Sequence, residues 1–275
     1  MVFWRVTLPF LAGYFVSYLY RSINAIIGPD LAREFDLTAG GLGLLSGIYF
    51  FAFALCQLPL GMLLDRYGPR RVNATLLLIA AAGAMWFALA RSVLELTLAR
   101  AVIGLGVSGC LVSSLSAFAL WYPAGRLSTM SGIAFASGML GAITVTVPLE
   151  LLLRMQGWRE VFHGIAGITF LASLLLYVVV PEKDAVRRGE QMRVPLATQL
   201  REFAALSRDP AFWRLAVCVG SSQLAAVSLG TLWVAAWLRD VAGYSQAQVA
   251  QALLVFNLVM IAGYLGFGRA ADALV

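Results

Sequence analysis

Charged residues are scarce in this sequence: they make up 12% of its 275 residues, whereas 61% are hydrophobic. Soluble domains contain about 25% charged and 45–50% apolar residues, so a soluble globular domain is excluded. The chain has one histidine and three cysteines, and the cysteines lack the spacing of metal ligands. Because the sequence shows no nucleophile–base pair, metal cluster or phosphate-binding loop, we expect neither an enzyme nor a cofactor or metal.

Long apolar runs dominate the chain instead. Each is about 20 residues long, enough to cross about 30 Å of hydrocarbon as a helix. Gly104, Gly106 and Gly109 lie inside one run, so we interpret them as small residues for close helix packing rather than as a dinucleotide-binding motif. No strand-like alternation occurs, so we predict an all-α membrane protein and exclude a β-barrel. The eight predicted spans are Val6–Ile27, Leu42–Leu64, Val72–Ala90, Leu94–Leu120, Met130–Leu153, Val161–Val180, Phe212–Leu238 and Ala247–Phe267.

The basic residues are distributed unevenly over the loops. Most lie after the second, fourth, sixth and eighth runs, so the positive-inside rule places those loops and the N-terminus in the cytoplasm. The net charge of +6 therefore reflects topology, and we expect no nucleic-acid partner. We expect a monomer that crosses the lipid bilayer several times, in the inner membrane if the source is bacterial.

The longest and most polar connection runs from Pro181 to Pro210, which predicts a boundary between two bundles. We predict a six-helix bundle at 1–181, a cytoplasmic linker at 182–211 and an incomplete second bundle at 212–275. A parallel internal repeat supports this division. A shift of 207 residues pairs Gly13 with Gly220, Thr38 with Ser245, Gly61 with Gly268 and Asp65 with Asp272.

Three motifs resemble those of the major facilitator superfamily. The stretch Gly61-Met-Leu-Leu-Asp-Arg-Tyr-Gly-Pro-Arg-Arg71 is similar to its loop motif between the second and third helices, with Pro69 in place of a usual arginine. Arg100-Ala-Val-Ile-Gly-Leu-Gly106 resembles the fourth-helix motif, and Gly157-Trp-Arg-x-x-Phe162 the start of the sixth helix. The resemblance implies two six-helix bundles around a central cavity and solute movement by alternating access.

On that pattern, the sequence holds the first bundle and two helices of the second, so we expect either a fragment or a transporter completed elsewhere. In the family, Asp65 would face the N-terminus of the eleventh helix, where the helix dipole attracts a carboxylate. The gating residues that the resemblance and the repeat imply are Gly61, Asp65, Arg66, Gly68, Arg70, Arg71, Arg100, Gly268 and Asp272.

Two of the arginines lie inside predicted spans. At helical rise, Arg21 is about 9 Å and Arg100 about 12 Å from the outer ends of their runs, so both could converge on one anion. The alternatives are snorkelling to the interface or bonds to backbone carbonyls, and for Arg100 we favour a structural or gating role. Tyr18 and Asn24 lie within one turn of Arg21 and are candidate substrate ligands with it.

The segment around Arg21 also resembles the first helix of anion-transporting facilitators, where an arginine contacts substrate phosphate or carboxylate. Organophosphate exchangers carry a second arginine in the seventh helix, but the repeat places Ser228 there. This difference favours a small carboxylate-type anion, as in the anion:cation symporter family. Trp233 and Asn257 are further candidates for the cavity.

The coupling ion is expected to be a proton or sodium. Glu150 and His163 are candidate coupling residues, although Glu150 could form a rim salt bridge with Arg154 and His163 could be a hydrogen-bonded rim residue. The alternatives that stay open are an organophosphate or phosphate exchanger, a drug–proton antiporter, and a transporter-like ligand sensor.

Overall fold

The computed structural model describes residues 2–145, 147–182, 205–228 and 241–274, together with positions 198, 201, 234, 237 and 238. All the regular elements in these residues are helices, as expected for an all-α membrane protein. They are η1 (Phe3–Thr7), α1 (Leu8–Phe35), α2 (Ala39–Leu89), α3 (Val93–Val107), α4 (Cys110–Trp121), η2 (Ala124–Arg126), α5 (Leu127–Thr144), α6 (Val147–Val179), α9 (Pro210–Ser228) and α11 (Gln246–Ala273).

Two glycines divide the longest helices. Gly68 in α2 has φ 77° and ψ 160°, and Gly157 in α6 has φ 78° and ψ 165°. This backbone region is accessible almost only to glycine. The second and third predicted spans are therefore the two arms of α2, and the sixth span is the part of α6 after Gly157.

Two span boundaries differ from the prediction. The fourth span is divided between α3 and α4 at Ser108 and Gly109. The fifth was predicted to reach Leu153, but α5 ends at Thr144 and α6 begins at Val147. Pro148 is the second residue of α6, a position where its missing N–H leaves no intrahelical hydrogen bond unmade.

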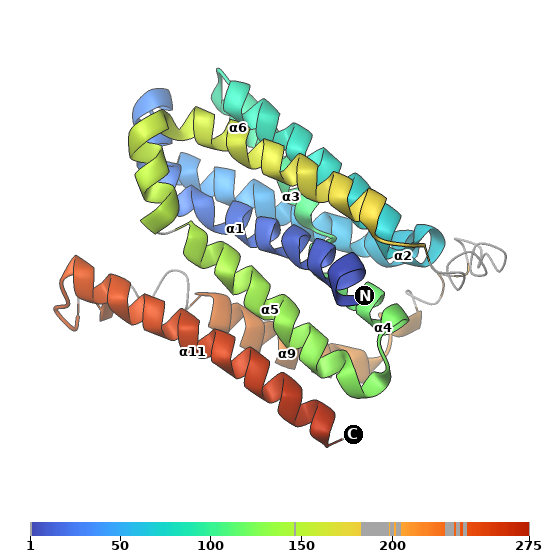
Figure 1. Ribbon diagram of the computed structural model, residues 1–275. Coiled ribbons are helices and arrows are strands. Elements are labelled where there is room, and N and C mark those ends of the chain that lie inside the picture. Colours follow the sequence, from blue (N-terminus) through green and yellow to red (C-terminus); the bar gives the residue numbers. More distant parts are fainter. Residues whose placement is uncertain are drawn as a thin grey trace. The chain divides into compact units, whose positions relative to one another are not determined.

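The chain forms two compact units: one comprises Met1–Gln191 and Met260–Val275, the other Met192–Val259. In the first unit, α2 packs against α3 and α6, and α1 packs against α5 and α6 (Figure 1). The larger of two buried clusters runs through these helices, with Phe10, Phe87, Phe118 and Phe162 among its fully buried side chains.

Glycines allow α2 and α3 to pack at backbone distance. A Cβ atom on Gly104 would lie 2.3 Å from the carbonyl oxygen of Tyr49, and one on Gly106 would lie 2.4 Å from the amide nitrogen of Ala80. Either side chain would force the helices apart. The interpretation of these glycines as close-packing residues agrees with the structure.

Six stretches of the described residues are long and apolar enough to cross a membrane. They do not include the predicted spans in α1 and α9. The six stretches are Gly40–Gln57, Pro59–Leu89, Val93–Trp121, Ala124–Val145, Met155–Val179 and Gln251–Ala273.

Candidate functional site

Arg21 lies half-buried on α1, between aromatic side chains of two helices. Its guanidinium carbon is 4.7 Å from the ring centre of Tyr18 on α1 and 5.4 Å from that of Phe53 on α2. Each ring face attracts the cation, and the attraction grows where water is excluded. The Nε atom of Arg21 is buried and has no hydrogen-bond partner among the described residues. The group thus retains hydrogen-bonding capacity for a ligand.

Asn24 lies one turn further along α1 and connects this helix to α2. Its Nδ2 atom donates a hydrogen bond of 3.2 Å to the hydroxyl of Ser46. The structure therefore brings Tyr18, Arg21 and Asn24 together, as the sequence predicted for neighbours on one helix. Phe53 and Ser46 come from α2 and could not be placed there from the sequence of α1.

Arg100 is fully buried in α3, with 1% of its surface exposed. Its Nη1 atom donates to the carbonyl oxygen of Tyr20 at 3.3 Å. The guanidinium carbon lies 5.1 to 5.9 Å from the ring centres of Phe87, Tyr49 and Phe162. Its Nε and Nη2 atoms are buried without a hydrogen-bond partner in the described part of the chain. The bond to a backbone carbonyl and the aromatic cage fit the structural or gating role that we favoured.

Tyr49 is a residue of this region that the sequence did not single out. It is 2% exposed and lies within electrostatic range of both Arg21 and Arg100. Its run, Ile48-Tyr-Phe-Phe51, looks like ordinary apolar sequence. The only signal in the sequence was the hydroxyl group itself, because a tyrosine that is buried usually forms a hydrogen bond through it.

The loop motif places its last two arginines against the end of α6. Arg70 donates through Nε and Nη2 to the carbonyl oxygen of Tyr177, at 3.0 and 2.6 Å. Arg71 pairs with Glu182 at 2.7 Å, and Arg70 lies 3.9 Å from the same carboxylate. Because α6 ends with unpaired carbonyls, these cations cap it favourably.

Three other members of this motif, Gly61, Asp65 and Arg66, are exposed. Gly61 has open space around it, and Arg66 lies over the ring of Tyr67 at 5.2 Å. Asp65 is exposed and contacts no partner among the described residues. Its predicted contact with an eleventh helix stays a prediction.

The second copy of the motif, by contrast, contacts a helix N-terminus. Asp272 accepts hydrogen bonds from the backbone amides of Ser128 at 3.0 Å and Thr129 at 2.7 Å, in the first turn of α5. Close packing accompanies this cap, since a Cβ on Gly268 would lie 2.8 Å from the carbonyl oxygen of Ser128. Asp272 thus satisfies two of the amides that a helix start leaves unpaired.

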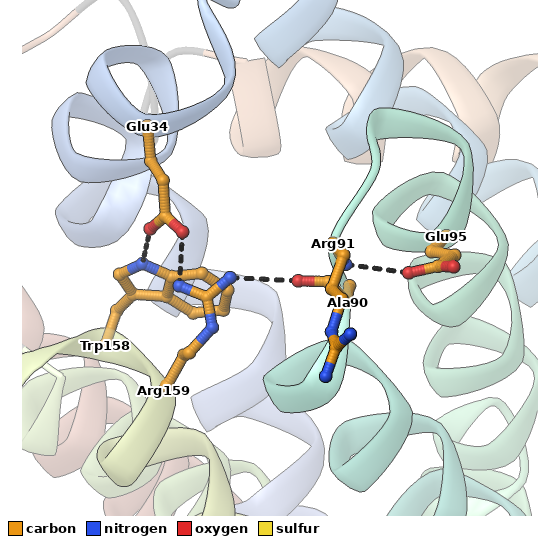
Figure 2. Close-up of polar contacts among 6 residues, drawn as sticks. All are labelled: Glu34, Ala90, Arg91, Glu95, Trp158 and Arg159. Atoms are coloured by element: carbon orange, nitrogen blue, oxygen red, sulfur yellow. Dashed lines mark hydrogen bonds and ion pairs between the residues drawn. The ribbon is translucent and has the colours of Figure 1, made fainter.

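An ion-pair cluster joins the ends of three other helices (Figure 2). Glu34 of α1 accepts from the indole nitrogen of Trp158 at 2.8 Å and pairs with Arg159, both on α6. Arg159 also donates to the carbonyl oxygen of Ala90 at 2.9 Å, just after α2. The Gly-Trp-Arg motif of the sequence therefore fastens the start of the second arm of α6 to α1 and α2.

The remaining candidates form local contacts or lie outside the described side chains. His163 is 3.5 Å from the carboxylate of Glu160 and is partly exposed, which fits the rim interpretation. Asn257, in the second compact unit, donates to the carbonyl oxygen of Leu253 in its own helix at 2.8 Å. Trp233 and the side chains of Glu150, Arg154 and Ser228 lie outside the described residues.

Apolar helices of membrane-crossing length, with charged clusters at their ends and arginines in their interior, define a multi-pass helical membrane protein. The family model of the Major Facilitator Superfamily matches residues 10–274. The chain belongs to this superfamily.

Several relatives of this chain are described as transporters of organic acids. A probable sulfoacetate transporter of Cupriavidus necator is 28% identical over 270 residues, covering 92% of this chain and 60% of the relative. A probable galactarate/D-glucarate transporter of Escherichia coli is 26% identical, covering 66% of this chain and 42% of the relative. A hexuronate transporter of Escherichia coli is 23% identical, covering 86% and 58%. The chain thus spans 60% or less of the length of these relatives.

The fold itself matches a solved transporter. The proton:xylose symporter XylE, bound to 6-bromo-6-deoxy-D-glucose, superposes with a TM-score of 0.71. Sequence identity is 16%, and the match covers 95% of this chain and 67% of that chain. At this identity the likeness establishes the fold and nothing about the cargo.

Proposed function

We propose that this protein is a secondary active transporter that moves a small organic anion of the carboxylate type across the membrane by alternating access. The observation that carries the proposal is Arg21, a half-buried guanidinium with an unpaired Nε atom, held between Tyr18 and Phe53. Guanidinium groups bind carboxylates and sulfonates through parallel N–H donors, which makes this site suited to an oxyanion.

The relatives support an anionic cargo. The proteins named above are described as transporters of sulfoacetate, galactarate or D-glucarate, and hexuronate, all of which carry an acid group. We propose a cargo of this class for the present chain. Tyr18 and Asn24 complete the proposed ligand set on α1, and Asn257 and Trp233 would add to it from the second bundle.

We also propose how the chain is organised around this site. Residues 1–181 form the first bundle, residues 182–211 a cytoplasmic linker, and residues 212–275 the start of the second bundle. We place the N-terminus in the cytoplasm, because most loop arginines lie after the even-numbered spans. The protein acts as a monomer, in the inner membrane if the source is bacterial.

The gating contacts belong to the two copies of the loop motif. The contact that supports this role is the one between Asp272 on α11 and the first turn of α5. Its two hydrogen bonds join a helix of each proposed bundle. Arg70 and Arg71 hold the end of α6 next to the first copy. Alternating access would break the Asp272 contact in one state and form it in the other.

The driving force is a gradient of protons or sodium. His163 and Glu150 are the proposed coupling residues, as side chains that can exchange a proton within or beside a span.

Uptake into proteoliposomes tests the proposal. The full-length protein is reconstituted and supplied in turn with radiolabelled sulfoacetate, D-glucarate, glucuronate and the neutral sugar xylose, under an inward proton or an inward sodium gradient. We expect uptake of at least one of the three anions under one gradient and none of xylose. Uptake of xylose alone, or binding of an anion without flux under either gradient, would refute anion transport, and the second result would favour a ligand sensor.

A further inference from the structure

Around Arg21, the interior of the first unit contains buried hydrogen-bond donors that have no partner in the part of the chain that the structure describes. Arg21 Nε, Arg100 Nε and Nη2, and the hydroxyl of Tyr49 are all buried and unpaired among the described residues. Most buried polar groups in proteins are paired, and each exception needs an explanation. Several exceptions in one neighbourhood point to a missing partner.

The ring of Tyr49 connects the surroundings of the two arginines. It stacks on Phe53 with ring centres 6.5 Å apart and planes at 29°, and Phe53 also lies under the Arg21 guanidinium. The guanidinium carbon of Arg100 is 5.8 Å from the same ring centre. Tyr49 is therefore placed next to both cations, within electrostatic range of each.

The position of Tyr49 is fixed by backbone packing. Its carbonyl oxygen would lie 2.3 Å from a Cβ on Gly104, which follows Arg100 by one turn of α3. Since α2 and α3 touch at this point, the backbones that carry the Tyr49 ring and the Arg100 guanidinium lie next to each other.

The chemistry of the three groups leaves one proton without an acceptor. A guanidinium has five N–H donors and no acceptor, so neither arginine can receive the hydroxyl proton of Tyr49. The Tyr49 hydroxyl forms no hydrogen bond with an acceptor among the described residues. An oxyanion beside Arg21 would supply one, because a carboxylate or sulfonate has several acceptor lone pairs.

We infer that the Tyr49 hydroxyl donates a hydrogen bond to an acid oxygen of the transported anion, next to Arg21. The acid group would then be held by a guanidinium and a phenol together. This inference rests on the proposed function and deepens it, since it adds a ligand from α2 to those on α1. It also gives Tyr49 a role in specificity: a cargo without an acid group leaves the hydroxyl proton unpaired.

Tyr20 provides a matched control. It is also a fully buried tyrosine close to Arg100, but its hydroxyl is paired with that of Thr169 at 2.8 Å. Removing the Tyr20 hydroxyl breaks a hydrogen bond between two hydroxyls of the protein. Removing the Tyr49 hydroxyl breaks no bond that its proton makes among the described residues, and loses only its interaction with the Arg21 guanidinium. The Tyr20 substitution should therefore change mainly the stability of the protein, and the Tyr49 substitution mainly the binding of the anion.

The experiment compares Tyr49→Phe and Tyr20→Phe in the full-length protein. Both are reconstituted for uptake of whichever of sulfoacetate, D-glucarate or glucuronate the wild type transports, and both are heated in detergent without the anion. For Tyr49→Phe we expect KM to rise about tenfold, because a hydrogen bond to a charged group is lost, with an unfolding temperature equal to or above that of the wild type. For Tyr20→Phe we expect the reverse: a lower unfolding temperature and a KM close to that of the wild type.

Two results would overturn the inference. The first is a KM for Tyr49→Phe equal to that of the wild type. The second is a loss of stability in Tyr49→Phe without the anion, as large as that in Tyr20→Phe, because the hydroxyl would then have a structural partner. A wild-type protein that takes up none of the three anions would instead refute the proposed function, and is recognised before either variant is measured.

Discussion

A guanidinium inside a helical membrane bundle needs groups that replace the water it has lost. Arg21 has two aromatic faces, and Arg100 has one carbonyl and three rings. No carboxylate among the described side chains forms an ion pair with either one. Buried charge without a counter-ion lowers stability, which suggests that these arginines are kept for their interaction with a ligand or for gating.

Arg100 allows this idea to be tested against stability. In Arg100→Met the side chain keeps much of its volume and fills the aromatic cage, while the unpaired Nε and Nη2 disappear. We expect the unfolding temperature in detergent to stay the same or rise, and anion uptake to fall by at least about tenfold.

Arg100→Lys serves as the control that keeps the charge but loses the planar group. A strongly destabilised Arg100→Met variant whose folded fraction transports normally would show that Arg100 is only structural.

The sequence was informative about Arg21 and Arg100 because a charge inside an apolar run is conspicuous. It was uninformative about Tyr49, since a tyrosine among phenylalanines is ordinary in a membrane helix. Its importance depends on how α2 packs against α1 and α3, and the backbone of Tyr49 packs closely on Gly104, which lies far away in the sequence.

At the scale of helices, the two arms of α2 depend on one backbone conformation. Gly68 has φ 77° and ψ 160°, a region that costs other residues about 1–3 kcal/mol. We therefore expect Gly68→Ala to lower the free energy of unfolding by about this amount, measured by thermal or denaturant unfolding in detergent.

Gly61 is the matched control in the same helix, seven positions earlier. A Cβ there meets nothing within 4 Å, so Gly61→Ala should leave stability unchanged or raise it, as expected for an exposed helical glycine. Equal losses in both variants would mean that the strained conformation of Gly68 contributes nothing to the effect.

The contact between Asp272 and α5 also belongs to this scale. Asp272→Asn keeps the shape of the side chain but removes the charge and replaces one acceptor oxygen by a donor. We expect the first turn of α5 to separate from the end of α11 more often. Distances between spin labels at the two helix ends should shift toward longer values in the full-length protein.

Asp36→Asn is the control for this prediction. Asp36 is a carboxylate with φ 50° at the end of α1, a conformation that asparagine tolerates equally well. An unchanged distance distribution in Asp272→Asn would contradict a gating role for this contact.

Helix boundaries show where the sequence was insufficient. The apolar runs revealed the spans and the internal repeat, but the fifth run hid the break between Thr144 and Val147. Both sides of that break are apolar, so no change in composition marks it. The repeat predicted the second copy of the loop motif from the sequence. Its partners Ser128 and Thr129 could not be predicted, because they depend on how α11 packs against α5.

For the whole molecule, superfamily membership follows from motifs spread along the chain, and the family model covers residues 10–274. Cargo is a separate matter, because one fold carries sugars as well as anions. We propose that a few side chains on α1 and α2 determine the cargo. Arg21 is the one among them with a full charge.

The most direct test is anion uptake by Arg21 variants of the full-length protein in proteoliposomes. Arg21→Ala removes the charge, and Arg21→Lys keeps it while losing the paired N–H donors. We expect uptake to fall at least about tenfold in both, whereas Arg33→Lys, at an exposed arginine paired with Asp30, should transport like the wild type. Wild-type rates of anion uptake in both Arg21 variants would contradict the assignment of Arg21 as the anion ligand.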